Sequence, residues 1–100
     1  MTRQEREDPV IEPLERLERA LTELGLTATL QRQMMIPYVQ VQMHRTPGEV
    51  VFASYGYPDG PRYFWDGLNH SHTLDDPPGA AERIATALNR EQRRAIAERG

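Results

Sequence analysis

The chain has 100 residues, of which 27% are charged, with a net charge of −3 and no cysteine. This is the size of one small domain with a modest core, and it excludes disulfides and thiolate metal sites. No apolar run is long enough to span a membrane and no signal-peptide pattern opens the chain, so we expect a soluble cytoplasmic protein.

The first predicted element is a helix over about residues 10–24. Residues 1–8 before it are polar and charged, and we expect a disordered arm followed by a single domain over residues 9–98. Apolar side chains then recur at every third or fourth position, as on the buried stripe of a helix, and Gly25 can end that helix in a left-handed conformation. The stripe consists of Ile11, Leu14, Leu17, Leu21 and Leu24.

Strands are predicted next, because apolar and polar residues alternate. The alternation indicates a short strand over residues 26–31 and a longer one over 38–44. Two turn sequences, Thr-Pro-Gly-Glu and Tyr-Pro-Asp-Gly, then connect strand 38–44 to strands over 50–55 and 62–66. These three strands form an antiparallel meander.

The chain continues through an extended edge segment at about residues 69–74 and ends in a second helix. Asp75 or Asp76 can cap this helix, with Pro77 at its first position. We expect the helix to cover residues 77–89 and to extend to 98. Its apolar stripe is Ala81, Ile84, Ala85 and Leu88, and the arginines near its end are Arg90, Arg93, Arg94 and Arg99.

The order of these elements predicts an α+β domain of two layers: helix, short strand, three-stranded meander, helix. Each helix has one apolar stripe, so we expect both helices to cover the same face of the sheet.

The two turns also predict which side chains share a face of the sheet. If each turn closes a tight hairpin, Met43 faces Phe52, and Phe52 faces Trp65. The core face is then Val39, Val41, Met43, Val50, Phe52, Tyr63 and Trp65. The opposite face collects Tyr38, Gln40, Gln42, His44, Val51, Ala53, Tyr55 and Phe64. A slip of one residue exchanges the two faces.

Aromatic residues on an uncovered sheet face favour a binding interface, because aromatic side chains dominate binding energetics. The alternative is that scattered apolar residues on a small domain need no partner. The commonest interface of this kind is a self-complementary dimer. The predicted partner-binding residues are Tyr38, Gln40, Val51, Ala53, Tyr55 and Phe64.

Two histidines raise the possibility of a metal site. His70 and His72 are two residues apart, so on a strand they point to the same side, and His44 could supply a third ligand. Nothing in the spacing brings His44 near them. We therefore expect these histidines to be solvated or hydrogen-bonded, with no metal and no cofactor bound.

An acid–base group is the enzymatic alternative, with Asp66, Asp75 and Asp76 beside the histidines. The sequence has no recognisable nucleophile elbow and no glycine-rich phosphate loop. A small core also leaves little room for a deep pocket. We expect a protein that is not an enzyme.

For nucleic acid, the order of elements is similar to that of the double-stranded-RNA-binding domain. That family has a lysine-rich start to its second helix, whereas this chain has Asp-Asp-Pro-Pro-Gly-Ala-Ala-Glu there and would repel phosphates. The negative net charge also argues against a dedicated nucleic-acid binder, although all twelve basic residues are arginine. The arginines at the other end of the helix leave an accessory role in contacting nucleic acid as the alternative function.

Three features together suggest a family resemblance over residues 14–88: the Leu-rich helix ending at Gly25, the aromatic strand Tyr63-Phe64-Trp65, and a DDPxxAAxxI helix start from Asp75 to Ile84. In these the chain resembles a group of small actinobacterial α+β proteins without an established function. The topology is also similar to secretion-chaperone-like domains, which bind partner peptides. The resulting hypothesis is a non-catalytic interaction or dimerisation module, regulatory or chaperone-like, that acts through its exposed sheet face.

Overall fold

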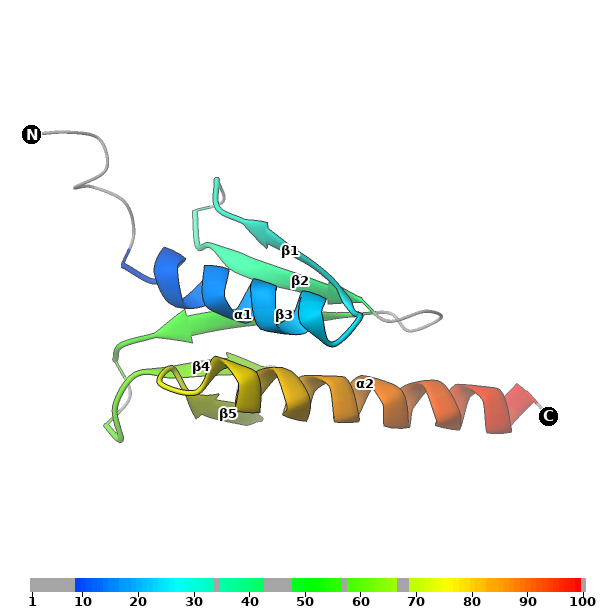
Figure 1. Cartoon of the computed structure of the whole chain (residues 1–100). Helices are drawn as coiled ribbons and strands as arrows, with labels where there is room; N and C mark the ends of the chain where they lie inside the picture. The colour runs from blue at the N-terminus through cyan, green and yellow to red at the C-terminus, as the bar shows by residue number, and fades with distance from the viewer. Residues whose placement is uncertain (1–8, 34, 43–47, 57, 67–68, 100) are drawn as a thin grey trace, which may run out of the picture.

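The computed structural model of the chain describes residues 9–33, 35–42, 48–56, 58–66 and 69–99, with side chains described as far as Arg90 (Figure 1). The predicted arm at residues 1–8 lies outside this part, and so do Met43 and His44. The elements in chain order are α1 (Ile11–Glu23), β1 (Thr27–Gln31), β2 (Tyr38–Gln42), β3 (Glu49–Ser54), β4 (Arg62–Trp65), β5 (His70–Thr73) and α2 (Pro77–Arg99).

The sheet contains five antiparallel strands in the order β1-β2-β3-β4-β5. The predicted α+β class is confirmed, but the sheet is larger than the predicted three-stranded meander. The short strand β1 pairs with β2 over its whole length, and the edge segment β5 pairs with β4 from Arg62↔Thr73 to Trp65↔His70.

Helix α1 forms where the leucine stripe predicts it and ends one residue earlier than expected. Leu14, Leu17 and Leu21 are fully buried, whereas Leu24 is exposed at the helix C-terminus. Gly25 takes a positive φ of 91°, and the Leu26 N–H then donates to the Leu21 carbonyl. This is the hydrogen bond of a Schellman-type end, and it lets Leu26 in place of Leu24 enter the core.

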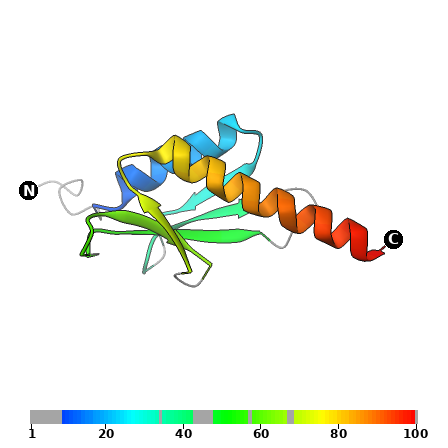
Figure 2. The same ribbon diagram turned by 90° about the horizontal axis from the view of Figure 1, so that it is seen from below.

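Both helices lie on the same side of the sheet, as Figure 2 shows. The core fills the space between them and the strands. Its buried side chains from the strands are Val39, Val41, Val51, Tyr63 and Trp65, and those from α2 are Ala80, Ala81, Ile84 and Leu88. The last turns of α2 extend beyond the sheet (Figure 1).

The strand register differs from the prediction. Val39 pairs with Val51 in β2–β3, and Phe52 pairs with Phe64 in β3–β4. Each observed register differs from the predicted one by an odd number of residues, and an odd shift exchanges the two faces of a strand relative to its neighbour. The faces of β3 are therefore the reverse of those predicted. At β4 the second shift reverses them again, so the faces of β4 are as predicted. Val51 is therefore fully buried, whereas Phe52 is on the other side.

The first error comes from the assumption of a tight hairpin turn. The connection between Gln42 and Glu49 is longer than a four-residue turn. Gly48 at its end has a φ of 93°, and a Cβ there would lie 2.8 Å from the Val41 carbonyl oxygen. Because glycine has no Cβ, the chain that enters β3 can approach β2 this closely. The close approach at Gly48 occurs together with the observed pairing of β2 and β3.

Tyr63 ties the sheet to the first helix. Its hydroxyl donates a 2.6 Å hydrogen bond to the Pro13 carbonyl, and the side chain is fully buried. Burial raises the pKa of the Tyr63 phenol, which therefore stays protonated as a donor at neutral pH.

We expect Tyr63→Phe to lower the free energy of unfolding by about 1–2 kcal/mol, because the Pro13 carbonyl loses its buried donor. Urea titration followed by circular dichroism measures the loss. Tyr55→Phe is the matched control: Tyr55 donates to the Pro9 carbonyl at 3.2 Å but is half exposed, so water replaces the bond. Equal losses in the two variants would contradict a special role for the Tyr63 hydrogen bond.

Candidate functional site

The sheet has an outer face that neither helix covers. Tyr38, Phe52 and Phe64 form a row across its three central strands. The ring centroids of Tyr38 and Phe52 are 5.7 Å apart, and those of Phe52 and Phe64 are 5.4 Å apart in a stacked arrangement. These spacings are typical of favourable aromatic pairs, so the row is one continuous surface.

The surroundings of this row are almost free of charge. By strand alternation the described residues of the outer face are Thr27, Thr29, Gln31, Tyr38, Gln40, Gln42, Val50, Phe52, Ser54, Arg62, Phe64, Ser71 and Thr73. Arg62 is the one ionised side chain among them, and its Nε donates to Ser71 Oγ at 2.9 Å. We call this surface the outer face below.

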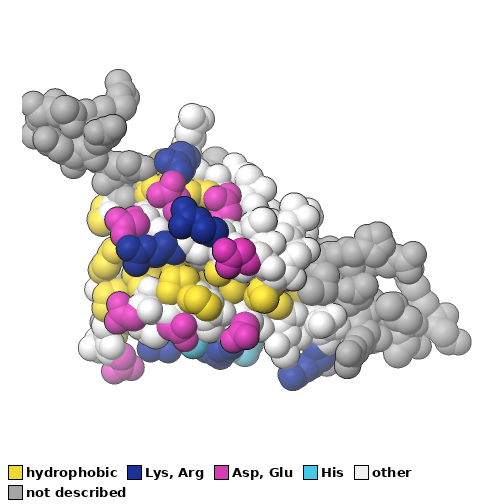
Figure 3. Space-filling model, viewed as in Figure 1, with side chains coloured by type: hydrophobic (Ala, Val, Ile, Leu, Met, Phe, Trp, Pro, Cys, Tyr) yellow, Lys and Arg dark blue, Asp and Glu magenta, His cyan; other side chains and the backbone are white. Residues whose placement is uncertain are grey.

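The helix side carries a different surface, as Figure 3 shows, with arginines and acidic residues intermixed over α1. Two ion pairs stand out there: Arg16 with Glu12 at 2.6 Å, and Arg32 with Glu15 at 2.7 Å. Both pairs are exposed and contribute little to stability. They add to the contrast with the outer face, where Arg62 is the one ionised side chain among the described residues.

The predicted partner-binding residues are divided by the structure. Tyr38, Gln40 and Phe64 lie on the outer face. Val51 is in the core, and Ala53 packs against it from the same side of β3. Tyr55 follows the end of β3 and bonds to Pro9 at the start of α1. Val50 and Phe52, which the sequence predicted for the core, lie on the outer face instead.

The two histidines of β5 point to the same side of the sheet, as their spacing predicts, and the structure shows that this is the helix side. His72 Nε2 lies 2.9 Å from Asp76 Oδ2, and its Nδ1 lies 3.4 Å from an Arg83 nitrogen. An arginine only donates, so in this arrangement Nδ1 accepts from Arg83 and Nε2–H donates to Asp76. His70 stacks on Trp65, and its Nε2 lies 3.6 Å from Asp66 Oδ2.

Asp76 is the cap of α2, as the sequence predicted for one of the two aspartates. Its Oδ1 accepts the Gly79 N–H at 3.1 Å, while Oδ2 accepts the bond from His72. The His72 hydrogen bond, and after it the Gly79 bond, lower the pKa of the Asp76 carboxyl. A Cβ at Gly79 would lie 2.0 Å from Asp76 Oδ2 and 2.8 Å from His72 Nε2, which explains a glycine inside a helix.

These contacts do not assemble the acid–base group that the sequence raised. Asp66 is beside His70 and Asp76 is beside His72, whereas the Asp75 backbone bonds to Thr73. Among the residues that the structure describes, no group of three His, Cys, Asp or Glu side chains is placed to hold a metal ion. His44 lies outside the described residues.

Comparison with known proteins adds no assignment, since no protein-family model, no curated protein and no solved structure matches the chain. Within the described part of the chain, neither helix combines the length and the apolar character needed to cross a membrane. Functional inference therefore rests on the two surfaces and their chemistry.

Proposed function

We propose that this chain is a non-catalytic interaction module that binds a second copy of itself through the outer face. The observation that carries the proposal is the aromatic row of Tyr38, Phe52 and Phe64 in surroundings whose described residues include one ionised side chain. Aromatic enrichment with few charges is the composition of an interface core, and it contrasts with the charged helix side.

The face rather than the edges of the sheet is the favoured contact. On β1 the Leu30 N–H donates to Glu18 Oε2 at 2.7 Å, and on β5 the Ser71 carbonyl accepts from Arg83 at 2.5 Å. On each edge strand, one backbone group that a partner strand could use is thus already hydrogen-bonded to a helix side chain. Such blocking disfavours the addition of a partner strand, so sheet-to-sheet packing is the available mode.

A second copy is a suitable occupant because a face with one ionised side chain among its described residues meets its own image with little like-charge repulsion. In a two-fold dimer the aromatic rows of both copies would pack against each other, and Arg62 is already engaged with Ser71. Burial of this face gains about 25 cal/mol per Å² of apolar area. A regulatory or chaperone-like role would use the same face for another protein in place of the second copy.

We expect the wild-type chain to form a homodimer and the double variant Phe52→Asp/Phe64→Asp to be a folded monomer. Two carboxylates at the centre of the interface would have to lose their hydration, so the dissociation constant should rise by more than about a hundredfold. Light-scattering chromatography over a concentration series measures the mass, and circular dichroism checks the fold.

Tyr55→Asp is the matched control, because it places the same charge on an exposed aromatic residue outside the face. It should leave the dimer intact. A wild-type monomer at high concentration would contradict self-association, and a partner whose binding the double variant abolishes would then identify the hetero-complex.

The alternative function, contact with nucleic acid through the C-terminal arginines, is separated by its salt dependence. Arg90 is exposed on α2, whereas the side chains of Arg93, Arg94 and Arg99 lie outside the described part. Phosphate contacts weaken steeply as salt is added, while apolar sheet contacts do not. The same chromatography at low and high salt, repeated with a short single-stranded RNA added, therefore also distinguishes the two functions.

A further inference from the structure

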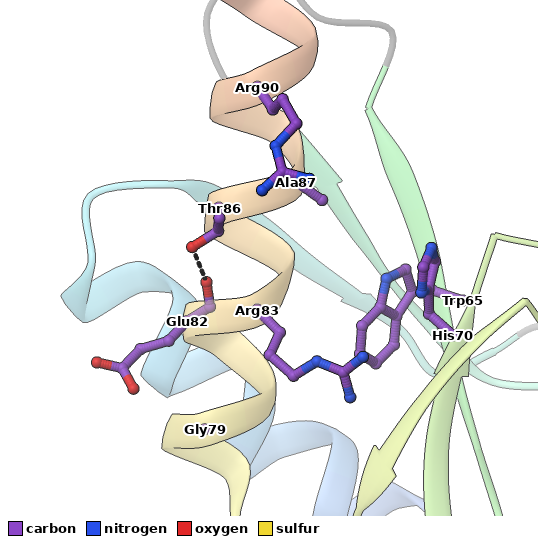
Figure 4. A pocket seen from close by; sticks show the side chains of 8 residues that line it. All are labelled: Trp65, His70, Gly79, Glu82, Arg83, Thr86, Ala87 and Arg90. Atoms are coloured by element: carbon purple, nitrogen blue, oxygen red, sulfur yellow. Dashed lines mark hydrogen bonds between the residues drawn. The ribbon is translucent and has the colours of Figure 1, made fainter.

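A groove of about 350 Å³ lies on the helix side, between α2 and the β4–β5 hairpin (Figure 4). The side chains that define its chemistry are Trp65 and His70 from the strands and Arg83 and Arg90 from α2. Its volume is at the lower end of the range for small-molecule sites. The groove is on the opposite side of the sheet from the outer face, so its occupancy is independent of the proposed dimer.

One wall of the groove is a stack of three planar groups. The Arg83 guanidinium carbon is 5.3 Å from the Trp65 ring centroid, and the His70 ring lies 6.0 Å from Trp65 with only 25° between their planes. Trp65 itself is buried, which fixes the stack to the core. Because Trp65 is buried beneath Arg83, the planar groups that this wall presents to a ligand are those of Arg83 and His70, which are exposed.

Arg83 is held in place by one nitrogen only. Its NH1 donates to the Ser71 carbonyl at 2.5 Å and lies 3.4 Å from His72 Nδ1. Among the described residues, neither Nε nor NH2 of Arg83 has a hydrogen-bond partner. This pair of donors has the geometry that binds a carboxylate or phosphate through two parallel bonds, and holding the side chain in advance reduces the entropy lost on binding.

The groove carries the positive charge of two arginines, and the Asp66 carboxylate lies beside its third polar wall residue, His70. Arg90 follows Arg83 by two turns on the same face of α2, and within the described chain neither forms an ion pair with a carboxylate. Figure 4 shows Arg83 reaching across to Trp65, whereas the Glu82 carboxylate points away. Asp76 is occupied by His72 and Gly79.

We propose that this groove binds a small anionic ligand in which a phosphate or carboxylate is attached to a planar ring. The oxyanion would lie between Arg83 and Arg90, and the ring would pack against the exposed His70. No bond is made or broken, so the proposed activity is ligand binding only.

The single tryptophan of the chain lies in this wall, so its fluorescence reports occupancy directly. Three probes are added to the wild-type chain: adenosine 5′-monophosphate, adenosine without phosphate, and benzoate. We expect adenosine 5′-monophosphate or benzoate to change the emission saturably and adenosine to bind at least about tenfold more weakly, as loss of a charged hydrogen-bond partner implies. Which of the two anions binds distinguishes phosphate from carboxylate.

Arg90→Gln removes one cation that forms no hydrogen bond or ion pair with the described part of the chain, and we expect it to weaken binding by about tenfold or more. Arg83→Lys keeps the charge but loses the paired donors, and it should weaken binding similarly. Arg19→Gln, an exposed arginine on α1, is the matched control and should bind as wild type. Circular dichroism of each variant checks the fold.

Three outcomes would overturn the proposal. The first is no saturable change with either anion at millimolar concentration, and the second is equal binding of adenosine and its monophosphate. The third is tight, salt-sensitive binding of a short single-stranded RNA by a chain that does not bind the monophosphate, which would make the arginines a nucleic-acid contact instead.

Discussion

Trp65→Ala is expected to lower the free energy of unfolding by about 3–5 kcal/mol, the range for truncation of a large aromatic side chain in a core. Trp65 is 3% exposed, although it stands at the last position of a short strand. The indole fills the space between β4 and α2, with Arg83 over its ring. Its removal leaves a cavity, and β4 and α2 would both have to move to fill it.

The total stability of a small domain is about 5–15 kcal/mol, so this single change can leave a large unfolded population. Urea titration monitored by circular dichroism measures it, because the variant has no tryptophan fluorescence. Tyr55→Ala serves as the control: that side chain is 51% exposed, and its loss should be about 1 kcal/mol or less. A similarly small loss for Trp65→Ala would show that the indole does not support the core.

The helices could be predicted from the sequence because their evidence is local. In α1 the apolar residues repeat with helical spacing, and the helix ends at Gly25 with a positive φ, a conformation that glycine adopts easily. In α2 the cap and the first-position proline are adjacent in the sequence. Each of these signals spans a few residues and depends on no partner elsewhere in the chain.

The faces of β3 could not be predicted in the same way. Its sequence, Glu-Val-Val-Phe-Ala-Ser, has apolar residues at both odd and even positions, so alternation does not select a buried face. The register is then decided by the length of the connection before Gly48 and by the close approach of that glycine to β2. The smaller Val51 lies under the helices, while Phe52 joins Tyr38 and Phe64 outside.

The candidate sites show the same limit. The sequence indicated an aspartate cap and two histidines on one side of a strand, and the structure joins them as one contact between His72 and Asp76. The signal that could have predicted this contact is Gly79, a poor helix former placed where a side chain would collide with both groups. The groove depends on α2 lying against the β4–β5 hairpin so that Arg83 reaches Trp65, which is non-local information.

The register makes a second prediction with a large effect. Val51→Asp is expected to prevent folding, whereas Val50→Asp is expected to leave a folded chain. Val51 is fully buried beneath the helices, where an ionised carboxylate has no partner and costs several kcal/mol or forces the fold open. Val50, its neighbour on the outer face, is partly exposed and can keep a charge hydrated.

The two variants have the same composition and differ only in which of two adjacent valines is replaced, so neither net charge nor β-propensity separates them. Circular dichroism and a thermal melt decide between the registers. The register that tight turns imply, with Val50 in the core and Val51 outside, requires the reverse result: a folded Val51→Asp and an unfolded Val50→Asp. Val50→Asp is also expected to weaken the proposed dimer, because strand alternation places Val50 on the same face as Phe52. A folded monomer of Val50→Asp beside an unfolded Val51→Asp would therefore support both the register and the outer face as the contact surface.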